Sequence, residues 1–360
     1  MSWEWTAETR ERLEAFLTER GLMDGAPTIT RIGEGHSNLT VLLQHGDTRL
    51  VLRRPPPPPI APGGNDVLRE ARLLTALGSS GLPIPQVLAT GQVGEVFDAP
   101  FFVMTWVDGH VITDVPPAAL AGETPAAAMG AALVDTLADL HAVDWRAAGL
   151  SDFGKPEGFN RRHLRRVASL AHGDDGALPA AFVPLYEWLD ANVPEESGAT
   201  IVHNDYRIGN VMWSKTAPAR LAAVLDWELT TIGDPLFDLA YLMASIPAPG
   251  ETPTPTQAMS LAALAPGFPS PGALAERYAE RTGRRIGRLD WYLAMVNWKL
   301  AAMYAFSRRR GHDPYFDPPE RVERFLAEAA RFSQRRAVRR ASSNSAKTHA
   351  CRAADFSAKA

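Results

Sequence analysis

The sequence predicts an α+β fold of two lobes: a small N-terminal β-sheet lobe with one helix, and a larger, mostly helical C-terminal lobe. A chain of 360 residues is too long for one small core, so we expect two units. Short apolar runs separated by turns, typical of strands, occupy much of the N-terminal part. From about residue 109 long, alanine-rich helical patterns follow, so the lobes are placed at residues 1–108 and 109–333.

The N-terminal lobe is expected to begin with a helix at about residues 6–20. The segment RIGEGHSNLTVLLQHGDTRLVLRRP then predicts strands broken by turns. His45-Gly46-Asp47 separates two apolar runs, as a β-hairpin requires. Two more strands are expected at about residues 86–91 and 101–107.

A helix is expected between the strand that ends in VLRR and the strand at about residues 86–91. Five prolines, residues 55–59, exclude a helix or a central strand and indicate an extended connection. The following NDVLREARLLTAL (65–77) places apolar residues at helical spacing, with Asn65 or Asp66 as the N-cap.

In the C-terminal lobe the clearest helix is AAAMGAALVDTLADLHAVDW (126–145). A short strand at 200–202 and two more in NVMWS and RLAAVLD predict a small sheet inside the helical part. GDPLFDLAYLMA then offers Asp234 as N-cap and Pro235 as the first residue of a helix. The remainder to about residue 333 is mostly helical.

The C-terminal tail, residues 334–360, differs from the rest of the chain. From residue 335 on it holds seven Lys or Arg and one Asp, so it carries +6 and the remainder −10 of the total −4. It lacks apolar periodicity, and we expect it to be disordered.

Charge and cysteine content exclude several classes of protein. The net charge of −4 leaves no global basic field, so nucleic acid is not an expected partner. The single cysteine, Cys351, excludes internal disulfides and cysteine zinc sites. The N-terminus lacks the pattern of a secretory signal, and the longest apolar stretch (291–306) falls short of a membrane span. We expect a cytoplasmic protein without a membrane partner.

The loop in IVHNDYRIGNVMW carries the residues that predict chemistry. Phosphoryl transfer needs a carboxylate near the attacking hydroxyl and oxygen ligands that hold magnesium on the phosphates. Asp205 provides the first, and Asn210, five residues later, provides an amide oxygen on the same loop. Asp226, at the end of the apolar run LAAVL, provides a second hard ligand.

HxD alone also fits an ordinary capped turn. The ordered set HxDxxxxN, a strand pair, an apolar run ending in Asp and then GDPxxD is far more specific to kinases. HNDYRIGNVMW together with AVLDWELTTIGDPLFDLAYL resembles the aminoglycoside phosphotransferase family, a relative of choline kinases and protein kinases, over about residues 25–330. Through GEGHSN, VLRRPP and DWELTTIGDP it is most similar to the phosphotransferase domains fused to some acyl-CoA dehydrogenases.

The resemblance implies a bilobal protein-kinase-like fold, with ATP or GTP between the lobes, Mg²⁺ as cofactor and a small-molecule hydroxyl acceptor on the helical lobe. Asp205 matches the catalytic-loop Asp, and Asn210 and Asp226 match the metal-binding residues. His203 matches a mainly structural histidine of the catalytic loop. Asp238 resembles a helix carboxylate that supports this loop from behind, and the alternative is a surface residue of that helix.

In the N-terminal lobe the resemblance places a phosphate-binding loop at RIGEGHSN, with Gly33 and Gly35. The third glycine of protein kinases is missing, so phosphate contacts are expected to depend on Ser37 and Asn38. Two glycines in a hairpin turn are by themselves weak evidence.

The strand residue that is lysine in protein kinases is arginine here, and the sequence offers Arg53 or Arg54. Strand alternation alone does not say which of them points inward. From VLRRPP we choose Arg53, which would pair with the phosphates and with Glu70 on the following helix. Backbone groups near Thr105 to Val107 are expected to serve the nucleotide base.

The acceptor site is expected among the helices after residue 250, where one stretch holds Trp291, Tyr292, Trp298, Lys299 and Tyr304. Aromatic residues at this spacing are more often core. Lys299 either binds an anionic partner or extends to the surface, and both interpretations stay open. Similarity to the fused domains favours a hydroxyacyl-CoA-like acceptor over an aminoglycoside.

Three competing classes of protein were weighed against a small-molecule kinase. A nucleotide-binding module without turnover is disfavoured because Asp205, Asn210 and Asp226 are all present. A metal-dependent hydrolase using His203 lacks the further histidines of a tight transition-metal site. A protein kinase is disfavoured because DWE replaces DFG and no segment ending in APE follows.

Overall fold

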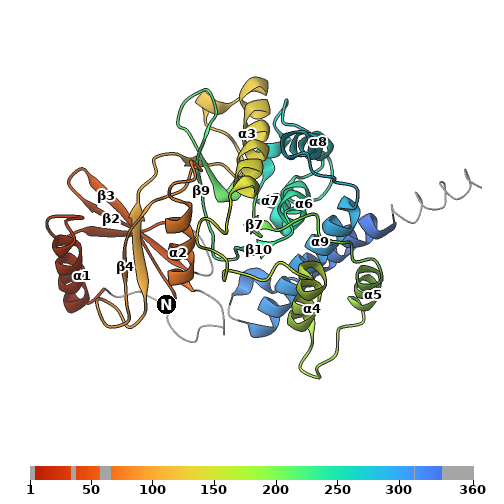
Figure 1. The fold of residues 1–360 in the computed structure, drawn as a ribbon, viewed down its shortest axis with the longest axis horizontal. Helices are drawn as coiled ribbons and strands as arrows, with labels where there is room; N and C mark the ends of the chain where they lie inside the picture. The colour runs from red at the N-terminus through yellow and green to blue at the C-terminus, as the bar shows by residue number, and fades with distance from the viewer. Residues whose placement is uncertain (1–4, 34–37, 57–65, 312, 335–360) are drawn as a thin grey trace, which may run out of the picture.

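The computed structural model describes residues 5–33, 38–56, 66–311 and 313–334. They form two lobes, the N-terminal one in red to orange and the C-terminal one in yellow to blue (Figure 1). The predicted α+β fold is confirmed. Among the helices of these residues, none is long and apolar enough to cross a membrane.

The N-terminal lobe is built on one antiparallel sheet of strand order β1-β2-β3-β5-β4. The strands are β1 (Thr28–Arg31), β2 (Leu39–His45), β3 (Thr48–Arg54), β4 (Val87–Gly91) and β5 (Phe101–Thr105). At the predicted hairpin His45 pairs with Thr48, so the turn has two residues. Its first residue, Gly46, has φ 56°, a backbone conformation that favours glycine.

Helices α1 (Ala7–Glu19) and α2 (Val67–Leu77) cover opposite faces of this sheet. Side chains alternate along a strand, so Leu50 and Leu52 of β3 pack with α1, whereas Val51 packs with α2. Of the two predicted caps of α2, Asp66 is the one used, because its side chain accepts a hydrogen bond from the N–H of Arg69.

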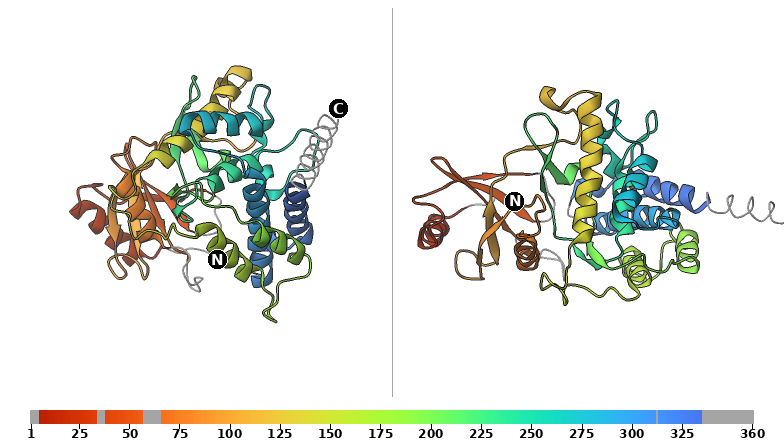
Figure 2. Two further views of the ribbon diagram at one scale, coloured as in Figure 1. Left: turned by 45° about the vertical axis from the view of Figure 1, so that its right-hand side comes forward. Right: turned by 45° about the horizontal axis from the view of Figure 1, so that its top comes forward.

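The C-terminal lobe holds most of the helices, and Figure 2 shows it beside the N-terminal lobe from two further sides. Its helices are α3 (Glu123–Ala142), α4 (Phe159–Ala171), α5 (Val183–Ala191), α6 (Leu236–Ser245), α7 (Pro255–Ala258), α8 (Pro271–Thr282) and α9 (Leu289–Arg310), and residues 319–334 are also helical. A continuous core of buried apolar residues joins these helices to the α2 face of the N-terminal sheet.

Two small sheets lie within this lobe and hold the catalytic-loop region. β7 (Thr200–Val202) pairs with β10 (Thr231–Gly233), and β6 (His110–Val111), β8 (Val211–Trp213) and β9 (Leu221–Val224) form the other. The predicted strands in this region are therefore present.

Helix α6 begins one residue later than predicted. Pro235 is its N-cap, and the Asp234 side chain accepts from the N–H of Leu236 at 3.0 Å. Asp234 still satisfies a free N–H of the first turn, although it lies one position before the cap.

Candidate active site

In the loop between β7 and β8, the predicted catalytic residue Asp205 and the predicted metal ligand Asn210 are hydrogen-bonded to each other. Nδ2 of Asn210 donates to Oδ2 of Asp205 at 2.7 Å and to the Asp205 carbonyl oxygen at 2.9 Å. Because the amide nitrogen faces Asp205, the amide oxygen is the atom that Asn210 can offer to a cation. The Asn210 carbonyl accepts from the N–H of Leu225 at 2.8 Å, so the residue before Asp226 is tied to the same loop.

Asp226 lies just beyond the end of β9 with φ 64°. Positive φ is uncommon for a residue other than glycine and is often found at functional sites. This backbone conformation turns the carboxylate toward the N-terminal lobe, where Oδ1 accepts from Nη2 of Arg53 at 2.8 Å.

Arg53 joins the two lobes through three carboxylates. Its Nε donates to Glu70 at 2.9 Å, and Nη2 reaches both Asp226 and Glu228, the latter at 3.3 Å. Burial lowers the pKa of the Arg53 guanidinium, but the three negative charges outweigh this effect and raise it above its ordinary value. Arg53 is therefore a permanent cation at the boundary of the lobes.

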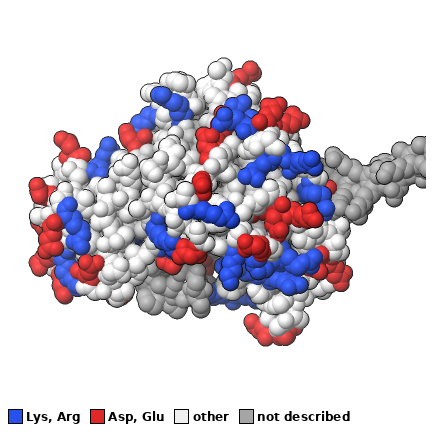
Figure 3. Space-filling view, viewed as in Figure 1, with Lys and Arg blue, Asp and Glu red and all other residues white. Residues whose placement is uncertain are grey.

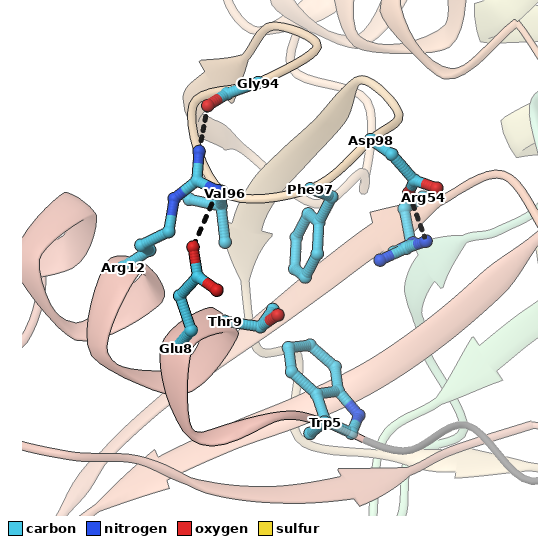
Figure 4. Close-up of a pocket in the computed structure, with 9 residues that line it drawn as sticks. All are labelled: Trp5, Glu8, Thr9, Arg12, Arg54, Gly94, Val96, Phe97 and Asp98. Atoms are coloured by element: carbon cyan, nitrogen blue, oxygen red, sulfur yellow. Dashed lines mark hydrogen bonds and ion pairs between the residues drawn. The ribbon is translucent and has the colours of Figure 1, made fainter.

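Arg54 points to the other face of the sheet, as strand alternation requires. It lies 3.5 Å from Asp98 and stacks 4.3 Å from the ring centre of Phe97. It lines a cavity of about 500 Å³ on the α1 side of the lobe, with Trp5, Phe97 and Asp98 around it (Figure 4). This cavity is separated from Arg53 and Asp226 by the sheet, so it is not the cleft of the catalytic loop.

Asp238 supports the catalytic loop from behind. It is fully buried, Oδ2 accepts from the backbone N–H of His203 at 2.6 Å, and Oδ1 accepts from that of Asn204 at 2.7 Å. Nε2 of His141 lies 3.2 Å from the same carboxylate. The alternative interpretation, that Asp238 is a surface residue of α6, is wrong, because Asp238 is buried and both of its carboxylate oxygens accept hydrogen bonds from the loop backbone.

His203 has both ring nitrogens engaged by backbone. Nδ1 accepts from the N–H of Asp205 at 3.3 Å, and Nε2 lies 2.9 Å from the carbonyl oxygen of Leu225. This arrangement ties the histidine ring to the loop backbone, as in the structural interpretation. Within the described residues, no group of three or more His, Cys, Asp or Glu is arranged to hold a metal ion.

The remaining nucleotide-site predictions have mixed outcomes. Gly35 and Ser37 lie outside the described residues, and Gly33 is exposed with φ 77°. Both the N–H and the side chain of Thr105 are bonded to the backbone of Gln86, at 2.9 and 3.0 Å. The Thr105 N–H is therefore unavailable to a base.

The aromatic residues of the stretch where the acceptor site was expected are core residues, the more frequent interpretation of their spacing. Trp291, Tyr292 and Trp298 are at most 1% exposed. The Tyr292 hydroxyl donates to Asp234 at 2.6 Å. Tyr304 is buried too, and its hydroxyl lies 3.2 Å from that of Tyr315. Aliphatic and aromatic neighbours on every side of α9 account for this burial.

Three residues of the site were missed by the sequence analysis. Nε of Arg207 donates to Oδ1 of Asp205 at 3.3 Å, and Glu228 accepts from Nδ2 of Asn38 at 2.9 Å. Burial, followed by the charge of nearby Asp205, raises the pKa of the third residue, Tyr241, well above its ordinary value. Arg207 and Glu228 each lie two residues after a predicted site carboxylate. That spacing was the signal that could have found them.

Comparison with known proteins agrees with this geometry. The model of the "Phosphotransferase enzyme family" matches residues 28–285. Acyl-CoA dehydrogenase family member 11 of Gallus gallus is 37% identical over 223 residues, which is 60% of this chain and 28% of that protein. The Homo sapiens member 11 is 31% identical over 306 residues, which is 82% of this chain and 38% of that protein. The chain thus spans 28 to 38% of the length of these relatives.

Solved structures share the fold. A Ralstonia eutropha protein described as a candidate aminoglycoside phosphotransferase is 28% identical, with TM-score 0.75, and the match covers 90% of this chain and 98% of that one. A thermostable mutant of aminoglycoside phosphotransferase APH(4)-Ia, in a ternary complex with AMP-PNP and hygromycin B, has TM-score 0.56 at 19% identity over 88% of this chain and 98% of that one. The two-lobed fold is therefore that of the aminoglycoside phosphotransferases, which confirms the resemblance stated from the sequence. With the family model matching well over half of its length, the chain belongs to the phosphotransferase enzyme family.

Proposed function

We propose that this protein is a Mg²⁺-dependent phosphotransferase that moves the γ-phosphoryl group of ATP or GTP to a hydroxyl of a small molecule. The carrying observation is how Asp205, Asn210 and Asp226 are connected. The first two are hydrogen-bonded at 2.7 Å, and Asp226 directly follows Leu225, whose N–H donates to the Asn210 carbonyl at 2.8 Å. A carboxylate for the hydroxyl and two hard oxygen ligands are what phosphoryl transfer requires.

Each residue has a separate role in this proposal. Asp205 orients the acceptor hydroxyl and takes its proton late in the reaction. The amide oxygen of Asn210 and the carboxylate of Asp226 form a donor set of hard oxygens, which fits magnesium better than a transition metal. Magnesium, when bound there, would neutralise phosphate charge. Arg53 already holds Asp226 at 2.8 Å, so its guanidinium is placed to meet the phosphates of a nucleotide.

The Arg53 role gives a ranking of two neighbouring arginines. Arg53→Ala should raise the nucleotide KM and lower turnover by at least ten-fold more than Arg54→Ala, because only Arg53 faces the cleft and a charged hydrogen bond is worth about 1.5–3 kcal/mol. Steady-state kinetics of both variants, with melting temperature as the folding control, measure this. The reverse kinetic order in two folded variants would contradict the assignment.

For the acceptor we propose a hydroxyl on an anionic metabolite of the hydroxyacyl-CoA type. The matched relatives are named acyl-CoA dehydrogenases, which supports an acyl-CoA substrate. Helix α4 supports an anion, because four exposed arginines follow one side of it: Arg161, Arg162, Arg165 and Arg166. Blue atoms gather on the lower right of Figure 3, in the part of the C-terminal lobe where Figure 1 places α4.

Helix α4 lies close to the catalytic region. It packs against α9. Burial, with a smaller contribution from the charge of Arg166, lowers the pKa of Arg69 on α2 and of Lys299 on α9. A polycationic aminoglycoside would be repelled by this helix and by Arg207 beside Asp205, whereas phosphate groups of a coenzyme would be attracted. An aminoglycoside acceptor is therefore the weaker alternative.

Reversing charge on this helix tests the acceptor assignment. Arg165→Glu with Arg166→Glu should raise the KM for a hydroxyacyl-CoA by ten-fold or more, while the nucleotide KM changes less than two-fold. The matched control is Arg10→Glu, at an exposed arginine of α1. An unchanged acceptor KM would remove α4 from the acceptor site without touching the assignment of the catalytic loop.

The function itself is tested by a nucleotide-consumption screen. ATP and GTP with magnesium would be offered together with hydroxyacyl-CoAs, hydroxylated free acids and aminoglycosides. We expect release of ADP or GDP when a hydroxyacyl-CoA is the acceptor, and no release with an acyl-CoA that lacks the hydroxyl. Nucleotide binding without acceptor-dependent turnover would favour the module without catalysis.

A further inference from the structure

Lys299 lies in the most apolar part of α9, yet its ammonium points at the catalytic loop. The residue is 7% exposed, and Nζ donates to the carbonyl oxygen of Asn204 at 3.1 Å. Of the two interpretations left open by the sequence, extension to the surface is wrong. A cation is buried behind the loop that carries Asp205.

The surroundings of this ammonium come from three other elements. Asp205 on the loop and Asp238 on α6 attract it, and the Tyr241 ring centre lies 5.6 Å away. From α4, Arg166 repels the ammonium. Burial, followed by the charge of Lys299, lowers the pKa of His163 on the same helix. Burial is the largest effect and lowers the pKa of Lys299 to about 8, against the pull of the two carboxylates.

The backbone N–H, the backbone carbonyl and the side-chain amide of Asn204 are all hydrogen-bonded. Its N–H donates to Asp238 at 2.7 Å, its Nδ2 donates to the carbonyl of Leu229 at 2.9 Å, and its own carbonyl accepts from Lys299. The residue adopts φ 68°, a conformation that is uncommon outside glycine and that these hydrogen bonds help to maintain. The Asn204 carbonyl belongs to the peptide group that leads directly to Asp205.

We propose that Lys299 is a positioning residue for phosphoryl transfer: its ammonium holds the peptide between Asn204 and Asp205 and offsets the charge of Asp238, so that the Asp205 carboxylate keeps its orientation. The inference rests on the proposed function. It differs from simple packing because it needs the charge of Lys299 and not only its bulk.

The charge of Lys299 affects stability differently from its bulk. The folded-state pKa of about 8 lies below the ordinary value of 10.5, so the unfolded chain binds more protons between these values. The protonated lysine is therefore unfavourable for folding below about pH 8, and this penalty disappears as pH rises toward 10.5. Lys299→Met, which keeps the length and loses the charge, should melt no lower than wild type at pH 7.

Loss of the Lys299 charge should lower turnover although it does not lower stability. At pH 7 Lys299→Met is expected to lower kcat roughly ten-fold, since a small displacement of a catalytic group is costly, with the nucleotide KM within two-fold. Wild-type kcat should fall as pH rises through about 8, and this alkaline decline should be absent from the variant. Lys155→Met, at an exposed lysine, is the matched control and should keep the wild-type profile.

The experiment measures kcat between pH 6.5 and 9.5, together with melting temperature, for wild type, Lys299→Met, Lys299→Gln and Lys155→Met. A slower but equally stable Lys299→Met without the alkaline decline supports the inference. Wild-type kcat and pH profile in that variant overturn it. If Lys299→Met does not fold, the kcat and pH profile of Lys299→Gln are compared with those of wild type instead. A wild-type kcat that stays constant up to pH 9.5 overturns the inference in either case. Absence of wild-type turnover with every acceptor would instead reject the proposed function.

Discussion

Replacing Asp205 by asparagine should lower kcat by about 10²-fold or more while nucleotide affinity changes little. Asparagine keeps the size and one acceptor oxygen but cannot take the proton of the hydroxyl. The structure adds a second reason. Both carboxylate oxygens accept hydrogen bonds, Oδ2 from Asn210 and Oδ1 from Arg207, so an amide nitrogen would face a donor on one side.

Steady-state kinetics with a competent acceptor, together with nucleotide titrations, check this result. Asp139→Asn, an exposed aspartate on α3 that pairs with Arg281, serves as control. Asn210→Ala should differ in kind, because loss of a metal ligand weakens both magnesium-dependent binding and turnover. Near-normal turnover of Asp205→Asn would mean that this loop does not catalyse phosphoryl transfer.

Loss of the Asp226 carboxylate should abolish magnesium-dependent nucleotide binding, with a fall in affinity of about 10²-fold or more, because phosphate charge is no longer offset through the ion. Asp226→Asn is the sharper variant beside Asp226→Ala, since asparagine tolerates the φ of 64° and keeps the backbone in place. Arg53 would keep Glu70 and Glu228 as partners in either variant.

Calorimetry with ATP in the presence and absence of magnesium measures this effect. Both Asp226 variants should show the same weak binding with and without the ion. Wild-type magnesium-dependent affinity in Asp226→Asn would contradict the metal assignment, and a loss confined to Asp226→Ala would assign the effect to the backbone.

The fold and the catalytic loop were predictable because their signals are local. Short sequence spacing identifies Asp205 and Asn210, and the period-two alternation of TRLVLRR guarantees that Arg53 and Arg54 face opposite sides. Alternation could not say which of them faces the cleft. That depends on α1 and α2 covering opposite faces of the sheet, which is a property of the whole lobe.

Contacts between distant segments were beyond the sequence. The Arg53 contacts with Asp226 and Glu228 cross 173 and 175 residues, and the Lys299 contact with Asn204 crosses 95. Periodicity cannot place such pairs, because it reports only which face of an element is apolar. For the same reason the two interpretations of Lys299, an anionic partner or extension to the surface, stayed open.

Direct detection of the phosphorylated product tests the central claim. The protein would be incubated with magnesium, ATP labelled in the γ-phosphoryl group and a hydroxyacyl-CoA, in parallel with Asp205→Asn. The proposal predicts that label appears as a phosphate ester on the acceptor hydroxyl in equal amount to ADP, and that the variant forms it at least about 10²-fold more slowly. Label released only as inorganic phosphate, or an ester formed equally fast by Asp205→Asn, would contradict it.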